Sequence, residues 1–169
     1  MADLAVNWYC IYVKSRHEFK VFERLTKSNI EAFLPAVDRL RRWKDRKKLV
    51  KFPLFPGYLF VCLEKSYEVM LKVLKIPGVV TFIKNPYGEP EPVPEEEIIP
   101  LRKAIENGKE IDPYPYLKEG QQIRIKSGPL AGATGILKKK ENQHYFIISI
   151  HMLQRAVSVK IDASEVELV

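Results

Sequence analysis

The sequence predicts an α+β fold, in which an N-terminal antiparallel sheet flanked by helices is followed by a small five-stranded β-barrel. In the N-terminal part, aromatic and β-branched runs alternate with segments whose apolar residues recur at helical spacing. The C-terminal part contains only short strand patterns, separated by turns rich in Gly and Pro. A chain of 169 residues is long enough for one or two domains of this size.

Four strands and three helices are expected in the N-terminal part. The strands are expected at 8–13, 32–40, 55–63 and 79–84, and the helices at 17–28, 68–74 and 95–107. Pro35 restricts the second strand to a sheet edge or a bulge, because proline has no N–H group to donate. Pro77 and Gly78 end the second helix, and Gly108 follows the third helix, whose first turn is acidic.

The C-terminal part is expected to begin after a linker at 109–116, which has two prolines and no helical periodicity. The predicted boundaries are therefore 5–108 for the first domain and 117–169 for the second. The strands of the second domain are expected at 121–126, 134–139, 145–150, 156–161 and 165–168. Several of them are rich in β-branched residues with a period of two, which favours a barrel over a helical ground state.

Composition excludes several classes of protein. The formal net charge of +7 favours polyanionic partners. Neither a signal peptide nor an apolar run of membrane-spanning length is present, so we expect a cytoplasmic protein with no membrane partner. Cys10 and Cys62 match no metal-binding spacing and are expected to be reduced core thiols. The three histidines are scattered and no phosphate loop or nucleophile motif occurs, so we expect no enzyme, no metal and no cofactor.

The segment Pro53–Val61 places an aromatic strand next to a basic run. Phe55, Tyr58 and Phe60 are too aromatic for a solvated loop, and aromatic side chains supply much of the binding energy at small interfaces. Alternate residues of a strand face opposite sides, so Tyr58 and Phe60 share one face and Leu59 lies on the other. One of these faces must build the core. The aromatic residues are therefore either a docking patch for a protein or core packing.

The basic run from Arg39 to Lys51 is predicted to be a charged hairpin with its turn near Asp45. Its cations are Arg39, Arg41, Arg42, Lys44, Arg46, Lys47, Lys48 and Lys51, and Trp43 lies among them. Cations around an aromatic ring suit phosphate contacts combined with base stacking, as in sequence-tolerant binding of nucleic acids. The alternative is a solvated hairpin whose charges keep the protein in solution.

Two sets of residues match the pattern of a known family. The N-terminal set is Trp8-Tyr9, Glu18, Leu25, Phe33-Leu34-Pro35, Phe55-Pro56-Gly57-Tyr58 and Pro77-Gly78-Val79. The C-terminal set is Gly120, Ile123, Ile125, Gly128-Pro129, Gly132, Gly135, the segment 155–159 and the segment 165–167. With the first set the chain resembles the N-terminal domain of the NusG family of bacterial transcription elongation factors. With the second it resembles the KOW domain of that family, an SH3-like β-barrel.

The resemblance implies a specific function. The family's N-terminal domain docks on the clamp helices of the largest RNA polymerase subunit, bridges the DNA cleft, and suppresses pausing and termination. Its KOW domain recruits ribosomal protein uS10, the termination factor Rho, or both. The implied identity of this chain is therefore a monomeric elongation and antitermination factor that also lies near upstream or non-template DNA.

Carried over by position, the resemblance implies three groups of site residues. The polymerase-binding residues are Tyr12, Phe55, Pro56, Tyr58 and Phe60. The nucleic-acid-binding residues are Lys14, Arg16, His17, Arg41, Arg42, Trp43, Lys44, Arg46 and Lys47. The partner-binding residues of the KOW domain are Met152, Leu153, Gln154 and Arg155.

The sequence departs from the family pattern at two places. Gln154 replaces the usual glycine of the partner-binding loop, and Leu153 replaces a frequent aromatic residue, so Leu153 is either a partner contact or a barrel residue. Segment 69–71 is apolar, whereas regulators such as RfaH have a polar motif there that contacts the second large subunit. The short linker and the basic run favour a specialised paralogue of the RfaH, UpxY or LoaP type, which antiterminates long operons for surface polysaccharides.

A second class of function stays open at this stage. A KOW-containing ribosomal or RNA-binding protein would use the basic run on structured RNA and would need no polymerase. Its RNA affinity would depend steeply on salt and would be insensitive to changes at Phe55 or Tyr58.

Overall fold

The structure is a computed structural model that describes residues 5–42, 44–117 and 120–169. The chain divides into two compact units. The N-terminal unit consists of Met1–Pro35 and Phe55–Pro94, and the C-terminal unit consists of Ala36–Leu54 and Glu95–Val169. Among the described residues, every helix is too short or too polar to cross a membrane.

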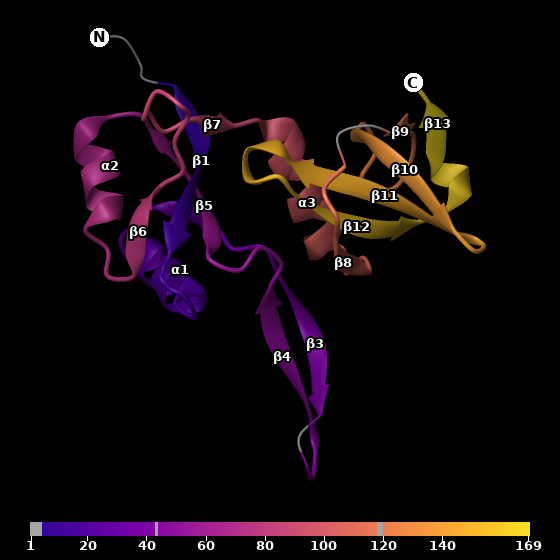
Figure 1. The fold of residues 1–169 in the computed structure, drawn as a ribbon, viewed down its shortest axis with the longest axis horizontal. Helices are drawn as coiled ribbons and strands as arrows, with labels where there is room; N and C mark the ends of the chain where they lie inside the picture. The colour runs from indigo at the N-terminus through magenta and orange to yellow at the C-terminus, as the bar shows by residue number, and fades with distance from the viewer. Residues whose placement is uncertain (1–4, 43, 118–119) are drawn as a thin grey trace. The chain divides into compact units, whose positions relative to one another are not determined.

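The N-terminal unit is built on an antiparallel sheet in which β1 lies at the centre (Figure 1). Its strands are β1 (Val6–Val13), β2 (Glu31–Phe33), β5 (Tyr58–Glu64), β6 (Val79–Phe82) and β7 (Pro92–Val93). They are ordered β2-β5-β1-β6, and β7 also pairs with β1. The long register between β1 and β5 runs from Val6 opposite Glu64 to Tyr12 opposite Tyr58, which fixes the faces of both strands.

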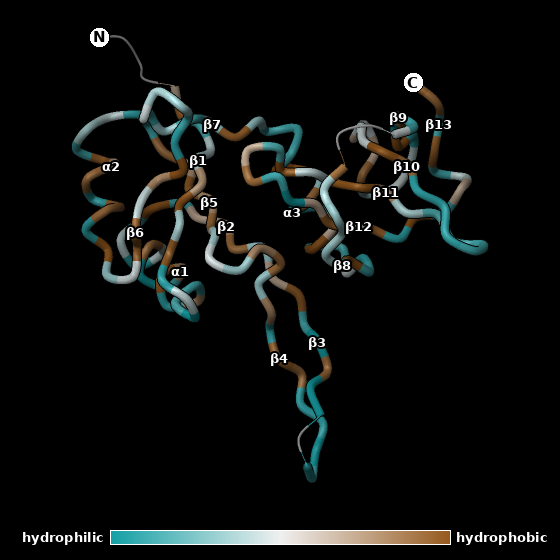
Figure 2. Tube along the Cα trace, viewed as in Figure 1, coloured by the Kyte–Doolittle hydropathy of each residue, from teal (hydrophilic) through white to brown (hydrophobic). Residues whose placement is uncertain are grey.

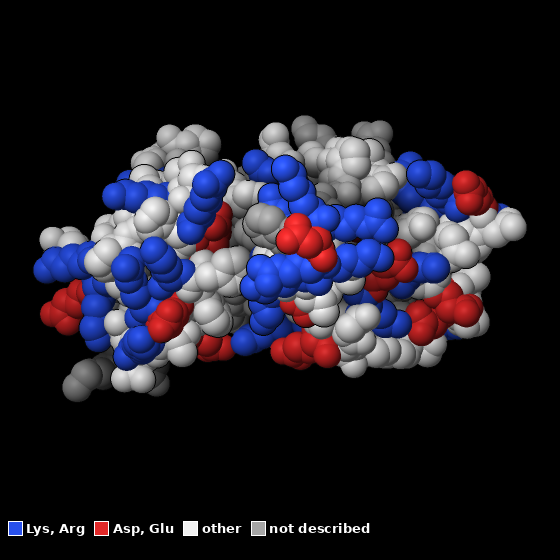
Figure 3. Space-filling view, turned by 90° about the horizontal axis from the view of Figure 1, so that it is seen from below, with Lys and Arg blue, Asp and Glu red and all other residues white. Residues whose placement is uncertain are grey.

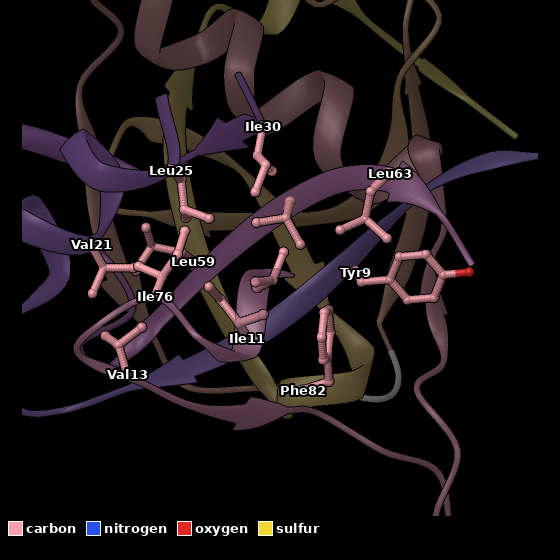
Figure 4. Packing of buried hydrophobic residues seen from close by; sticks show 12 residues of the cluster. Tyr9, Ile11, Val13, Val21, Leu25, Ile30, Leu59, Leu63, Ile76 and Phe82 are labelled. Atoms are coloured by element: carbon pink, nitrogen blue, oxygen red, sulfur yellow. The ribbon is translucent and has the colours of Figure 1, made fainter. Parts of the chain in front are cut away.

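Two helices complete the N-terminal unit, α1 (Glu18–Lys27) and α2 (Tyr67–Leu74). Val21 and Leu25 of α1 pack on Ile11 and Leu59 of the sheet, in the cluster that Figure 4 shows. The hydroxyl of Ser66 accepts a hydrogen bond from the Val69 N–H at 3.3 Å and so begins α2 as its N-cap. The helices therefore cover one face of the sheet, and this face contains the main core of the unit.

The basic run forms a two-stranded sheet of its own, the β-hairpin of β3 (Ala36–Arg42) and β4 (Lys47–Pro53). Its register is regular over seven pairs, from Ala36 opposite Pro53 to Arg42 opposite Lys47. Figure 2 shows that its outer half is hydrophilic except at isolated positions. Most of its side chains are exposed to solvent, so its strands are held together mainly by backbone hydrogen bonds.

The rest of the C-terminal unit is an antiparallel β domain with one helix, α3 (Glu95–Glu106). Its strands are β8 (Ile111–Tyr114), β9 (Gln121–Ile125), β10 (Thr134–Lys140), β11 (Gln143–Ile150), β12 (Arg155–Ile161) and β13 (Val166–Leu168). Two 3-10 turns, η1 (His151–Leu153) and η2 (Ala163–Glu165), connect them. The strand order is β13-β9-β10-β11-β12-β8, and each neighbouring pair is antiparallel.

Both faces of β11 and β12 contain buried residues. Phe146, Ile148, Val157 and Val159 are buried on one face, and Ile147 and Ala156 on the other face are buried as well, in a cluster with Ile136. A side chain at Gly135 would meet the Phe146 ring at 2.6 Å and the Ile147 carbonyl at 2.7 Å. Only glycine fits there, because β10 lies directly on these two residues.

The α+β fold class and the all-antiparallel C-terminal domain are confirmed, but local expectations differ from the structure at three places. The strand expected at 32–40 is divided into β2 and β3, because Leu34 and Pro35 lie outside both strands. Strand β7 was not expected. The segment expected to be an irregular linker contains β8, where Pro113 is tolerated because β8 is the edge strand beside β12. The predicted domain boundaries stay a prediction.

Candidate functional site

A cluster of aromatic residues lies on the side of the N-terminal sheet opposite the helix-covered core, and Trp8, Phe33 and Phe60 within it are buried. Cross-strand pairing places Tyr12 directly opposite Tyr58, and Phe33 directly opposite Phe60. The ring centroids of these pairs are 5.5 Å and 6.1 Å apart, and Trp8 meets Phe33 edge to face at 6.5 Å. We call Trp8, Tyr12, Phe33, Tyr58 and Phe60 the aromatic face.

The predicted polymerase-binding residues fall into two groups by burial. Tyr12 is 40% exposed, Pro56 is exposed and Tyr58 is half-buried, so these three reach the surface. Phe55 and Phe60 are fully buried. Phe55 and Phe60 therefore contribute to packing, and the other three residues are the ones accessible to a partner.

The turn that joins Phe55 to β5 depends on a glycine. Gly57 has a φ of +89°, and a side chain there would meet the Tyr12 ring at 3.0 Å. The Tyr58 N–H donates to the Phe55 carbonyl at 3.0 Å, and the Val13 N–H donates to the Gly57 carbonyl at 2.8 Å. The turn is thus tied to β1, and this places Pro56 and Tyr58 beside Tyr12.

A buried carboxylate holds the same turn from the helix side. Glu18, the first residue of α1, is only 6% exposed, and its Oε1 accepts a hydrogen bond from the Gly57 N–H at 3.1 Å. A carboxylate at a helix N-terminus is also favoured by the helix dipole. The sequence placed Glu18 in the family pattern without a role, because its partner lies 39 residues away and only the fold reveals it.

The basic hairpin presents its cations on two different faces. The pairs Arg41 with Lys48 and Arg39 with Val50 lie on one face. Arg42 with Lys47 and Asp38 with Lys51 lie on the other face, and the pair Leu40 with Leu49 lies between these two. Figure 3 shows Lys and Arg side chains gathered at the centre of the view, where the end of the hairpin faces the reader.

Most of the hairpin residues that were predicted to bind nucleic acid are exposed. Arg41, Arg42, Lys44, Arg46 and Lys47 are all in this class. Trp43 lies outside the described residues. On the inner part of the hairpin, Arg39 Nη2 binds Asp112 Oδ1 of β8 at 3.0 Å, so this cation is partly neutralised.

Lys14, Arg16 and His17 lie in the turn between β1 and α1, within the N-terminal unit. Lys14 and Arg16 are exposed, and Arg16 has a φ of +64°. His17 Nδ1 lies 2.8 Å from the Ser15 carbonyl oxygen. These three residues belong to the N-terminal unit, whereas the hairpin belongs to the C-terminal unit.

The predicted partner-binding loop corresponds to η1 and the start of β12. Met152 and Leu153 are half-buried, whereas Gln154 and Arg155 are exposed. Gln154 has φ +49° and ψ +45°, the left-handed conformation in which glycine has no steric penalty. The loop therefore has the backbone conformation that glycine favours, although glutamine stands at this position.

Helix α3 contributes a carboxylate to this loop, which sequence reasoning missed. Glu97 Oε1 accepts a hydrogen bond from the His151 N–H at 2.8 Å, and His151 Nδ1 lies 2.8 Å from the Tyr116 hydroxyl. Among the described residues, Glu97 Oε2 has no hydrogen-bond partner although it is buried. Burial raises the pKa of Glu97 above its ordinary value, against the opposing effect of the His151 hydrogen bond.

The chain is similar to known transcription termination and antitermination proteins. The family model described as "Transcription termination factor nusG" matches residues 6–102. Proteins named transcription termination/antitermination protein NusG are similar along almost the whole chain. The one from Campylobacter jejuni is 26% identical, covering 95% of this chain and 96% of its own. The one from Pseudomonas aeruginosa is 26% identical, covering 98% and 100%.

A solved structure described as "Domain interaction in Thermotoga maritima NusG" has the same fold. Its TM-score against this chain is 0.59, with 24% sequence identity and 98% of each chain covered. The structural match includes the C-terminal β domain, which the family model does not reach.

Proposed function

Because this chain belongs to the NusG family of transcription termination and antitermination factors, we propose that it docks on the clamp helices of RNA polymerase through the aromatic face. Proteins of this family are not enzymes. Bound there, the chain would keep the clamp closed and suppress pausing and termination in the cytoplasm. The exposure of Tyr12 beside Pro56 and Tyr58 is the observation that supports this proposal most strongly.

The chemistry of the aromatic face suits a protein partner. Tyrosine combines a large apolar ring with a hydroxyl that tolerates water, so it is stable at the surface and gains energy when covered. The rings of Tyr12 and Tyr58 pack against each other, with centroids 5.5 Å apart, which restricts their positions. A preorganised patch of this kind loses little side-chain entropy on binding.

The hairpin is proposed to contact upstream or non-template DNA. Its exposed cations have the chemistry that phosphate groups require, and phosphate contacts position a protein without reading sequence. Lys14 and Arg16, exposed in the turn before α1, are proposed as further phosphate contacts, together with His17.

The loop at 152–155 is proposed to recruit uS10 or Rho. Leu153 is half-buried, so part of its side chain is available to a partner. Within the family, we propose a specialised paralogue on the basis of the short linker and the basic run, although segment 69–71 departs from the RfaH pattern. Val69 and Met70 pack on the core of the N-terminal unit, so this segment does not present the polar contact found in RfaH-type regulators.

The proposal is tested by binding of the isolated clamp-helix fragment of RNA polymerase to the full chain. Tyr58→Ala is expected to weaken binding at least tenfold, because central aromatic residues dominate small interfaces. Tyr67→Ala is the matched control, since Tyr67 is 80% exposed on α2 and lies outside the aromatic face. Circular dichroism confirms that both variants fold.

Three results of this experiment are informative. Loss of binding in Tyr58→Ala alone supports the docking patch. Equal affinity of both variants and the wild type moves the docking site elsewhere. If the wild type does not bind the fragment but binds structured RNA with a steep salt dependence, the ribosomal alternative replaces the polymerase proposal.

A further inference from the structure

The hairpin exposes two leucines that neither its fold nor its charge explains. Leu40 and Leu49 are 61% and 63% exposed, and they lie directly opposite each other on the same face of the ribbon. Exposed apolar residues are common singly, but a facing pair in the middle of a basic ribbon forms a small apolar patch. We call Leu40 and Leu49 the leucine pair.

Cations bracket the leucine pair along the ribbon. Arg42 and Lys47 lie one step toward the turn on the same face, and Lys51 lies one step toward the base, opposite Asp38. Successive positions of one face are about 7 Å apart, so Lys47 and Lys51 are separated by roughly 14 Å along the strand. The edge with Arg42 and Lys47 has the stronger positive charge, because Asp38 partly offsets Lys51.

These distances match a groove of duplex DNA. The major groove is about 12 Å wide and admits a two-stranded β-ribbon, whereas the minor groove of about 6 Å is narrower than such a ribbon. A ribbon lying across the major groove would place its two sets of cations on opposite phosphate walls. The leucine pair would then face the edges of the bases. In that groove, the apolar group that base edges present is the C5-methyl of thymine.

We propose that the leucine pair contacts thymine methyl groups in the major groove of duplex DNA, while Arg42, Lys47 and Lys51 contact the flanking phosphates. This inference rests on the proposed contact between the hairpin and DNA, and adds a preference for A·T-rich duplex. The face on which Arg39 binds Asp112 is the opposite one, so the leucine face is not the one that meets β8. RNA duplexes are disfavoured as the ligand, because their major groove is too deep and narrow for side chains to read.

Replacing thymine by uracil tests the contact, since the two bases differ only by the methyl group. Fluorescence anisotropy is measured with an A·T-rich DNA duplex and with the same duplex containing uracil at each thymine position. The wild type is expected to bind the thymine duplex about fourfold more tightly for each methyl contacted, because burying one such group is worth about 0.8 kcal/mol. The double variant Leu40→Ser/Leu49→Ser is expected to bind both duplexes equally, with an affinity near that of the wild type for the uracil duplex.

Leu168→Ser serves as the control, because Leu168 is 70% exposed in the C-terminal β domain. It is expected to keep the full preference for thymine. Because the leucine pair is already exposed, its replacement is expected to leave the melting temperature unchanged, and a thermal melt verifies this.

Each other outcome has a separate meaning. If the wild type binds both duplexes equally and with a steep salt dependence, the thymine contact is wrong and the proposed phosphate contact stands. If the leucine variant retains the preference, the methyl contact is made by other residues and the inference is overturned. If the wild type binds neither duplex, the proposed DNA contact itself fails. If the variant binds both duplexes like the wild type but loses affinity for RNA polymerase, the leucine pair is a protein contact instead.

Discussion

Strands β1 and β5 and the hairpin of β3 and β4 are both antiparallel pairs with a register of seven residues, but they use their faces in opposite ways. In β1 and β5, Ile11 and Leu59 are buried on one face and Phe60 on the other. Among the described residues of the hairpin, no side chain of either strand is fully buried: the face of the leucine pair is mostly exposed, and the face of Arg39 is mostly half-buried. Burial fixes the conformation of the first pair, and exposure leaves the second pair free to bind a ligand.

The burial of a position determines whether its mutation acts on folding or on binding. In β1 and β5, which are buried on both faces, replacing a side chain mainly lowers stability, and any loss of binding follows from that. In the hairpin, a side chain contributes little to folding, so its effect on a ligand is measured almost without a stability cost. Matched positions in the two environments should therefore respond differently to the same kind of substitution.

Phe60→Ala is expected to destabilise the chain by about 3–5 kcal/mol, because it leaves a cavity beside the stacked ring of Phe33. Leu49→Ala in the hairpin is expected to change stability by less than about 0.5 kcal/mol, because Leu49 is already exposed. Urea unfolding followed by tryptophan fluorescence measures both. Similar losses for the two variants would contradict the contrast between the strand pairs.

Gly57→Ala is expected to cost about 2 kcal/mol and to weaken docking, because alanine is strained at a φ of +89° and would press on Tyr12. Gly88→Ala is the matched control, with a φ of +80° and open space around it. It retains the backbone strain without the contact. The difference between their unfolding free energies isolates the contact with Tyr12, and equal costs would remove that contact from the account.

Gln154→Gly is expected to stabilise the chain by about 1 kcal/mol, because it removes the cost of a left-handed residue with a side chain. Gln143→Gly is expected to destabilise it slightly, since Gln143 begins β11 in an ordinary strand conformation. Thermal melts of the two variants are compared. A loss of stability in Gln154→Gly would mean that the glutamine side chain has a stabilising contact in the loop.

Glu97 is expected to make stability depend weakly on pH. Its pKa is raised by burial from the ordinary 4.5, so the folded protein binds more protons than the unfolded chain just above that pH. The free energy of unfolding should therefore fall as pH rises through this range. Glu97→Gln should lose this component, and the difference between the two proteins is read from urea unfolding at several pH values. A parallel dependence in both would contradict the burial of the carboxylate.

The sequence was sufficient for the features that depend on local pattern. Alternation predicted that Tyr58 and Phe60 share one face, and the charge run predicted the hairpin. Features that depend on distant partners were not predictable. Glu18 accepts a hydrogen bond from Gly57, and Glu97 accepts one from the backbone of His151. Because both partners are distant in the sequence, the residues next to Glu18 and Glu97 do not reveal these interactions.

Strand β8 shows a different limit of sequence reasoning. The two prolines of segment 109–116 indicate an irregular segment, and the position at the edge of the sheet makes Pro113 compatible with a strand. The burial of Phe55 was also inaccessible, because aromatic residues fit a core and a docking surface equally well. The five predicted docking residues differ in their exposure to solvent, and exposure depends on how the whole unit folds.

The most direct test of the account measures two affinities of the full chain, one for the clamp-helix fragment and one for duplex DNA, in two variants. Tyr58→Ala should lose affinity for the fragment and retain affinity for DNA. The double variant Arg42→Ala/Lys47→Ala should retain its affinity for the fragment. For DNA, the slope of log affinity against log salt concentration should decrease in magnitude by about two, one for each cation removed. If either variant weakens both affinities to the same extent, the aromatic face and the hairpin do not have separate functions, and the account is wrong.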